Sequence, residues 1–426
     1  MTDTPRRTGP LRRSLFTAGM LLLVFGEVAG AEVELPSHQH DPVPVDESLT
    51  MTEAVAAAFA LYPTTMELAA RAEEANAWTD RGQSWLADRP SLMMRYQSDR
   101  WGADNGLDEY EAGVELPLWS LGGRSAVQHL GDALSAESVA AGLALRWEVA
   151  GLLRGAMWGI ALAENDHELA EQALETAARL TTSVERRYEL GDVALSDVLL
   201  AQSTFLEAQT ALIEATATLL DAERVYRSVS GLEIRPPFHD ETLSQSHEVT
   251  FDHPALALAN AEVVRAEASL SVAEKTFNSG ANLLIGSRSE RPALGSEFDE
   301  SIGITVSIPF GGSSHQRTQI SAASRAAASA RAARSQQMRV LNLQLHEAAH
   351  SLNVVSENLT ASEERMDLAE RHQGMGESAY EKGELELIDL LKVQATAIAA
   401  RRQVTRLKIE QKRQTAFYNQ AVGELP

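Results

Sequence analysis

The strongest constraint on this sequence is that it contains one unit twice. Residues 188–202 and 380–394 share the pattern Tyr-x-x-Gly, followed six residues after the glycine by Asp, and their offset is 192 residues. Further upstream, the segments 114–118 and 306–310 align at the same offset, and Pro63 aligns with Pro254 at an offset of 191. A repeat of this length predicts a fold built from two copies of one set of elements.

Two long windows without proline, residues 118–235 and 310–425, predict the helical part of each copy. Proline interrupts a helix interior, so its absence permits long helices. Each window has one break, at Gly191 and at Gly383, where glycine can adopt the left-handed conformation of a helix end. Each window therefore predicts a helical hairpin, whose first arm in the first copy, residues 124–189, would be roughly 100 Å long.

Apolar pairs in the second arm recur every seven residues, which is the spacing of a coiled-coil seam. In the first copy the pairs are Val198/Leu199, Phe205/Leu206, Leu212/Ile213 and Leu219/Leu220. The second copy has weaker pairs, such as Ala397/Ile398 and Val404/Thr405.

Before each hairpin, apolar and polar residues alternate with a period of two, which predicts β-strands. Ile302, Ile304, Val306 and Ile308 share one face in the second copy, and Tyr110, Ala112, Val114 and Leu116 share one in the first. The predicted partner strands are residues 92–101 and 281–288, joined by loops at 102–108 and 289–300. Such strands are typical of outer-membrane barrels, although amphipathic hairpins on a soluble sheet would alternate in the same way. Four strands cannot close a barrel, so a membrane-spanning subunit would have to oligomerise.

The N-terminus and the composition predict an exported protein. Four arginines precede an apolar run at residues 15–25 and an Ala-Gly-Ala cleavage pattern at 29–31, as in a secretory signal peptide. No later stretch approaches the roughly 20 apolar residues of a transmembrane helix, so any membrane span would consist of strands. The absence of cysteine excludes disulfides and a lipid-anchored N-terminal Cys. A net charge of −23 argues against nucleic acid as a partner.

With these features the sequence resembles the TolC family of outer-membrane efflux proteins. The resemblance rests on the duplicated strand-exit motif, residues 115–119 and 307–311, and on the duplicated hairpin motif, and it covers about residues 48–423. It implies an α+β membrane protein in the outer membrane of a Gram-negative bacterium, extending into the periplasm. The implied assembly is a homotrimer, whose 12-stranded β-barrel in the lipid continues as an α-helical tunnel.

The resemblance also implies roles for particular residues. The hairpin tips, with Tyr188, Gly191, Tyr380 and Gly383, would contact a periplasmic adaptor protein. In the family, acidic residues after the inner turn narrow the periplasmic entrance and attract cations; Asp389 matches that position, and Asp197 is its counterpart in the outer hairpin. Lys392 stands where the family often has a second acidic residue, which changes the charge of the predicted gate. Whether Lys392 pairs with the carboxylate of a neighbouring subunit is open.

Two histidine patterns in the sequence resemble metal-binding sites. His346-Glu347-Ala348-Ala349-His350 fits the HExxH pattern of zinc proteases. It lies inside an Ala-rich helical segment without a surrounding site, so we interpret His346 and His350 as surface or tunnel-wall residues. His38 and His40 are weak candidates for metal binding in a polar tail. The sequence predicts no catalytic residues and no cofactor, and therefore no enzyme.

The predicted division is a signal peptide (1–31), an N-terminal extension (32–47) and two repeats (48–235 and 236–426). The favoured function is the passive exit duct of a tripartite pump, with an adaptor and an inner-membrane transporter of the resistance-nodulation-division (RND) type. The alternatives are a soluble periplasmic coiled-coil structural or adaptor protein, the outer-membrane component of type I protein secretion, and a zinc hydrolase. The cargo, whether metal ion, drug or polypeptide, is not determined by the sequence.

Overall fold

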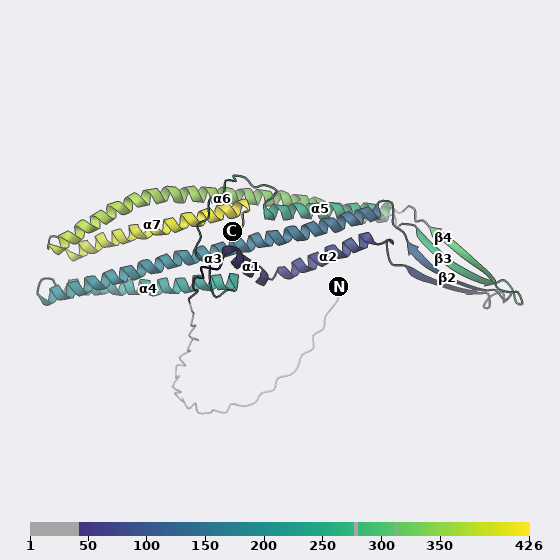
Figure 1. Cartoon of the computed structure of the whole chain (residues 1–426), viewed down its shortest axis with the longest axis horizontal. Coiled ribbons are helices and arrows are strands. Elements are labelled where there is room, and N and C mark those ends of the chain that lie inside the picture. The colour runs from purple at the N-terminus through teal and green to yellow at the C-terminus, as the bar shows by residue number, and fades with distance from the viewer. Residues whose placement is uncertain (1–41, 277–279, 312) are drawn as a thin grey trace, which may run out of the picture. The chain divides into compact units, whose positions relative to one another are not determined.

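The computed structural model describes residues 42–276, 280–311 and 313–426, which lie in one unit, Pro42–Pro426. The predicted signal peptide and His38 and His40 fall outside these described residues. Figure 1 shows the unit with its strands at one end of the helices and the two helical turns at the other.

The two halves of the described chain share a series of one helix, two strands and two long helices, and the first half has the additional helix α1 before it. In the first half α1 (Met51–Leu61) and α2 (Thr65–Gln83) precede β1 (Ser91–Ser98), β2 (Asp108–Pro117), α3 (Gly123–Glu189) and α4 (Leu195–Ser230). In the second half α5 (Pro254–Lys275) precedes β3 (Asn282–Arg291), β4 (Asp299–Ser307), α6 (Ser313–Glu381) and α7 (Leu387–Val422). The long helices α3 and α6 have 67 and 69 residues, and α4 and α7 have 36 each. The predicted duplicated architecture is confirmed, while the boundary at 235/236 stays a prediction.

The four strands form one antiparallel sheet in the order β1-β2-β3-β4. The predicted end of the third strand at residue 288 is wrong, because β3 continues to Arg291. Charged side chains from Arg288 onward have ion-pair partners on β2: Arg288 lies 2.9 Å from Glu109, and Arg291 pairs with Asp108. Such pairs stabilise strand residues whose polarity alone predicts a loop.

Each helix packs side by side with particular neighbours, and the neighbours change along the length of the unit. Near the strands, α3 lies between α2 and α5, and α5 also packs against α6. Farther from the strands, α3 pairs with α4, α6 pairs with α7, and α3 also contacts α7. The two hairpins therefore lie next to each other in the order α4-α3-α7-α6 (Figure 1).

In the first three apolar pairs of the predicted coiled-coil seam of α4, one member is exposed. Val198 is buried against α3, whereas its neighbour Leu199 is exposed. Leu206 and Ile213 are exposed in the same way. Consecutive helical residues point about 100° apart, so two adjacent residues cannot both face the same partner helix.

A buried arginine joins the two halves midway along α3. Arg154 is 1% exposed and donates to both carboxylate oxygens of Glu241, at 2.7 and 2.8 Å. The same guanidinium donates to the Gln420 side chain and, at 2.9 Å, to the backbone oxygen of Glu424. Asn419 of α7 also donates to Glu241, at 3.0 Å. This network ties α3 to the segment before α5 and to the end of α7.

The buried His253 gives the structure a pH dependence. Its Nδ1 accepts the backbone N–H of Ala255 at the start of α5, and its ring lies edge-on against Trp147. Burial lowers the pKa of His253 below its ordinary value of 6.5. The folded chain therefore keeps the ring neutral at pH values where the unfolded chain binds a proton, and stability falls as the pH drops below about 6.5.

We expect His253→Asn to weaken this acid sensitivity, because asparagine can still cap the helix but does not titrate. The measurement is the unfolding midpoint of both proteins between pH 7 and pH 5, with His239→Asn as a control outside the buried cluster. Parallel pH profiles for wild type and His253→Asn would contradict the assignment.

Candidate functional site

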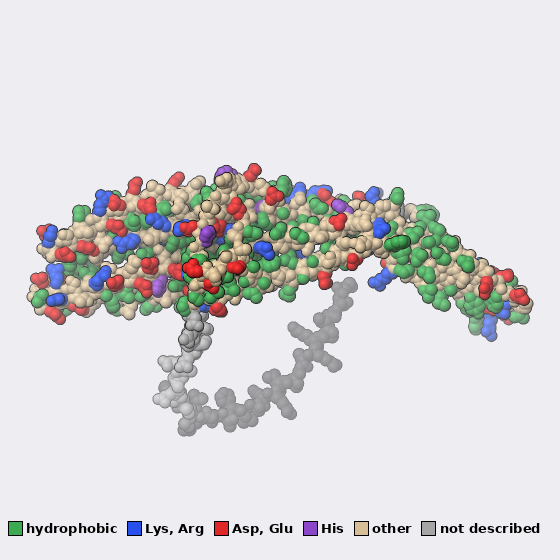
Figure 2. All heavy atoms as spheres, in the orientation of Figure 1, with side chains coloured by type: hydrophobic (Ala, Val, Ile, Leu, Met, Phe, Trp, Pro, Cys, Tyr) green, Lys and Arg blue, Asp and Glu red, His purple; other side chains and the backbone are tan. Residues whose placement is uncertain are grey.

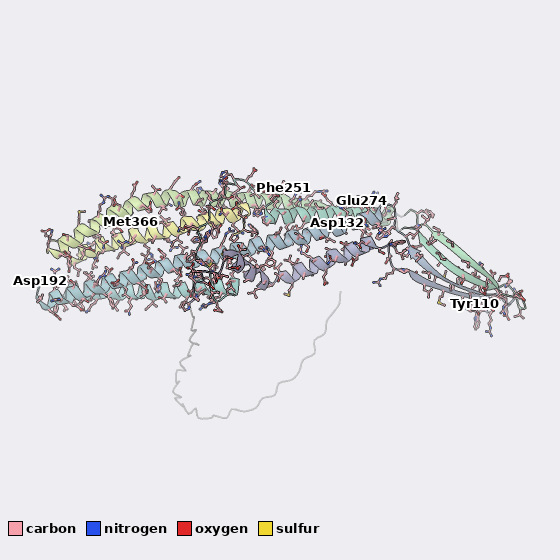
Figure 3. The ribbon with its side chains drawn as sticks, in the orientation of Figure 1. Tyr110, Asp132, Asp192, Phe251, Glu274 and Met366 are labelled. Carbon is pink, nitrogen blue, oxygen red and sulfur yellow. The ribbon has the colours of Figure 1, made fainter. Side chains whose placement is uncertain are left out.

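The two hairpin turns form matching tips at one end of the helical unit. Gly191 and Gly383 have φ values of 82° and 76°, which a residue with a Cβ rarely adopts. Each turn is closed by the glycine N–H, which donates to the carbonyl of Tyr188 at 2.9 Å or of Tyr380 at 3.0 Å. Open space surrounds both glycines. Figure 3 labels Asp192 at the first tip, far from Tyr110 in the sheet.

The two equivalent tyrosines have different surroundings. Tyr188 is 44% exposed, whereas Tyr380 is 8% exposed. Tyr380 packs with Val184, Val198 and other apolar residues of both hairpins, and the Arg187 guanidinium lies 4.8 Å from its ring centre. An apolar cluster and a cation–π contact therefore hold the second tip against the first.

The predicted gate residues lie in the first turns of the helices that leave the tips. Asp197 is the third residue of α4, and Asp389 is the third of α7. A carboxylate in a first turn is favoured by the partial positive charge of the helix N-terminus. Lys392 Nζ lies 2.9 Å from Asp389 Oδ1 in the same helix, and their side chains are 69% and 49% exposed. Each acidic residue thus also has a local structural role, and the charge of Asp389 is compensated within its own chain.

A second contact between the hairpins was not predicted from the sequence. Asp166 of α3 lies 3.3 Å from Arg402 and 3.0 Å from Arg406, both on α7. Two arginines four residues apart share one face of a helix, which is the only sequence signal of this site. Their acidic partner is 236 and 240 residues away, so its identity required the structure.

The sheet has one apolar face and one polar face. Leu92, Val114, Ile285 and Ile304 pair across the four strands on the first face. On the other face the corresponding row is Arg95, Glu111, Arg288 and Ser301. Figure 2 shows hydrophobic side chains gathered over the strands, with charged ones near their far end. Within the described residues, β1 and β4 each have one edge without a partner strand.

The two histidines of the HExxH pattern lie on the surface of a long helix. His346 and His350 are exposed side chains in the interior of α6. Within the described part of the chain, no group of three or more potential ligands could hold a metal ion. Nor, among those residues, does any helix combine the length and apolar character needed to cross a membrane.

Comparison with known proteins gives a family match for part of the chain. Residues 58–231 match the model of the outer membrane efflux protein family. No curated protein matches the chain in sequence.

Several solved structures share the fold. The outer membrane protein VceC from Vibrio cholerae is 15% identical, with a TM-score of 0.69 over 88% of this chain and 97% of its own. CusC, whose structures show conformational changes accompanying folding and transmembrane channel formation, is 14% identical, with a TM-score of 0.69 over 91% of this chain and 99% of its own. The outer membrane channel CmeC from Campylobacter jejuni is 13% identical, with a TM-score of 0.66 over 88% of this chain and 85% of its own.

Proposed function

We propose that three copies of this chain form the outer-membrane exit duct of a tripartite efflux pump. The observation that carries the proposal is the four-stranded sheet with one apolar face, one polar face and two unpaired edges. Pairing β4 of one copy with β1 of the next would close twelve strands around the polar face. The apolar face would then contact the outer-membrane lipid, and no backbone edge would face hydrocarbon.

The hairpin tips would lie in the periplasm and meet the adaptor protein. Tyr188, Gly191 and Gly383 leave room for an approaching helix, because they are exposed or lack a side chain. An inner-membrane transporter of the RND type would supply the energy through the adaptor. Transport then needs no reacting groups in this chain, and we propose that it is not an enzyme.

The gate would be formed by Asp389 of three copies, with Lys392 beside each carboxylate and Asp197 on the outer hairpin. In each copy the Asp389–Lys392 pair keeps the ring nearly neutral. The gate should therefore prefer cations only weakly, which departs from a purely acidic entrance. Opening would separate the hairpins at the contacts of Asp166 and Tyr380.

Single-channel recording in a planar bilayer tests the duct and its gate together. We expect stepwise conductance from the signal-processed protein. Lys392→Gln should raise the permeability of cations relative to anions several-fold at about 0.1 M salt, where the Debye length is about 10 Å, and less at 1 M, where it is about 3 Å. Asp389→Asn should shift the ratio towards anions.

The matched control is Asp221→Asn, which removes a similar exposed carboxylate far from the tips and should leave the ratio unchanged. A protein that stays in solution without detergent and gives no conductance would contradict the proposed duct. Normal conductance with identical ion preference in all variants would contradict only the gate assignment.

A further inference from the structure

The polar face of the sheet carries a group of charged side chains centred on Arg288. Arg288 lies on β3, and its Nε is 2.9 Å from the carboxylate of Glu109 on the neighbouring strand β2. Its Nη2 is 2.9 Å from the carboxylate of Glu290, two residues farther along β3. One guanidinium therefore pairs with two carboxylates at once, and the removal of this single side chain would leave both without their cation.

The strand register places further charges on the same face. Residues two apart in a strand point to the same side, and directly paired residues of neighbouring strands lie on the same face. Glu111 pairs directly with Arg288, and Glu109 pairs with Glu290. Within the four strands, the charged residues of this face are two arginines and five carboxylates: Arg95, Glu109, Glu111, Glu115, Arg288, Glu290 and Asp299. The polar face is therefore acidic in total, and each of its two arginines neutralises a large part of that charge.

Arg288 is held more closely than the other arginine of this face. Arg95 lies 3.8 Å from Glu111, whereas both ion pairs of Arg288 measure 2.9 Å. Glu109 is only 6% exposed, while 44% of the Arg288 side chain is exposed. Arg288 therefore decides how much of the negative charge of Glu109 and Glu290 reaches the space in front of the sheet.

The opposite face of β3 carries a second arginine in a matching situation. Arg291 is three residues from Arg288, so the two side chains point to opposite faces of the sheet. Arg291 also pairs with a carboxylate of β2, that of Asp108, and its guanidinium lies 5.2 Å from the ring centre of Phe298. The same strand thus offers two paired arginines that differ mainly in the face on which they lie.

In the proposed duct the face of Arg288 lines the lumen. Twelve strands spaced about 4.8 Å apart and tilted by about 40° enclose a cylinder roughly 24 Å across. Every ion in this lumen is within roughly 12 Å of the wall, which is close to the Debye length of about 10 Å at 0.1 M salt. Charges on the wall therefore act on ions throughout the lumen.

We infer that the strands, and not the hairpin tips, set the ion preference of the natural duct, and that Arg288 is the residue that determines it. At the tips Asp389 is paired with Lys392 of its own helix, so the charge there is largely compensated. On the polar face the carboxylates outnumber the arginines, and the lumen should attract cations. This inference rests on the proposed duct and adds a specificity-determining residue to it.

Reversal potentials of single channels in a salt gradient test this role. In the full-length protein, Arg288→Gln should raise the permeability of cations relative to anions several-fold at about 0.1 M salt, and less at 1 M, where the Debye length is about 3 Å. Arg288→Lys keeps the charge and should keep the natural ratio. Glu290→Gln removes one of the two carboxylate partners and should shift the ratio towards anions.

The matched control is Arg291→Gln, which removes the same charge from the same strand on the opposite face and should leave the ratio unchanged. A cysteine variant separates charge from shape, since the natural chain has no cysteine. In Arg288→Cys channels, a positively charged methanethiosulfonate reagent should return the ratio towards that of the natural protein, and a negatively charged one should raise it further.

The outcomes separate this inference from the proposed duct. Conducting channels in which Arg288→Gln and Glu290→Gln keep the natural ratio would overturn the role of Arg288 and leave the duct intact. An equal change in Arg288→Gln and Arg291→Gln would also overturn it, because the effect would then not depend on the lumen-facing side. A natural protein that gives no conductance would overturn the proposed function itself.

Discussion

Arg154→Ala is expected to lower the free energy of unfolding by about 3–5 kcal/mol, because it leaves a paired, largely buried carboxylate without its cation. Glu241 accepts two hydrogen bonds from this guanidinium and is only 17% exposed. The Gln420 side chain and the Glu424 carbonyl lose a donor at the same time. The measurement is the midpoint of unfolding in guanidinium chloride. Tryptophan fluorescence reports the transition, since Trp147 and Trp158 lie nearby on α3.

Arg179→Ala is the control for this prediction. Arg179 pairs with Glu175 at 2.9 Å, but both side chains are 69% exposed. An exposed pair on one helix contributes about 0.3–0.5 kcal/mol, so this midpoint should hardly move. Equal losses in the two variants would show that the buried network does not hold the halves together.

Gly280→Ala is expected to prevent the sheet from forming in its native register. A Cβ at this position would lie 1.6 Å from the backbone oxygen of Leu118, and the neighbouring Ala281 carbonyl accepts the Leu118 N–H at 2.9 Å. Backbone atoms cannot move aside as a flexible side chain can, so β2 and β3 would have to separate where they begin to pair. We expect a loss of about 3 kcal/mol, the upper end of the usual cost of overpacking.

Trypsin resistance of the protein in isolated outer membranes measures this effect. Gly142→Ala serves as the control, because a Cβ there meets nothing within 4 Å and the residue lies inside α3. Alanine at a helix interior should stabilise the chain by up to about 1 kcal/mol. Full resistance of Gly280→Ala would contradict the close approach of the two backbones.

The sequence by itself determined the duplicated architecture, because its signals are local and periodic. Two proline-free windows predicted the hairpins, and Gly191 and Gly383 marked their turns, where the structure has positive φ. Alternation of period two located all four strands and predicted the apolar face of β2 and β4. The third strand was predicted too short, since its polar end at Arg291 is held by Asp108, a partner 183 residues away.

Only the tertiary structure decided how these elements meet. The apolar pairs of α4 predicted a single coiled-coil seam, but the packing of α3 decided that Val198 is buried and Leu199 is not. The roles of Tyr380, Asp166 and Arg154 depend on residues from other helices, which no local pattern specifies. Lys392 was identified from the sequence, whereas its pairing with Asp389 of its own helix came from the structure. Local periodicity fixes the direction of a side chain on its own helix or strand, and the partner it meets depends on how distant segments pack.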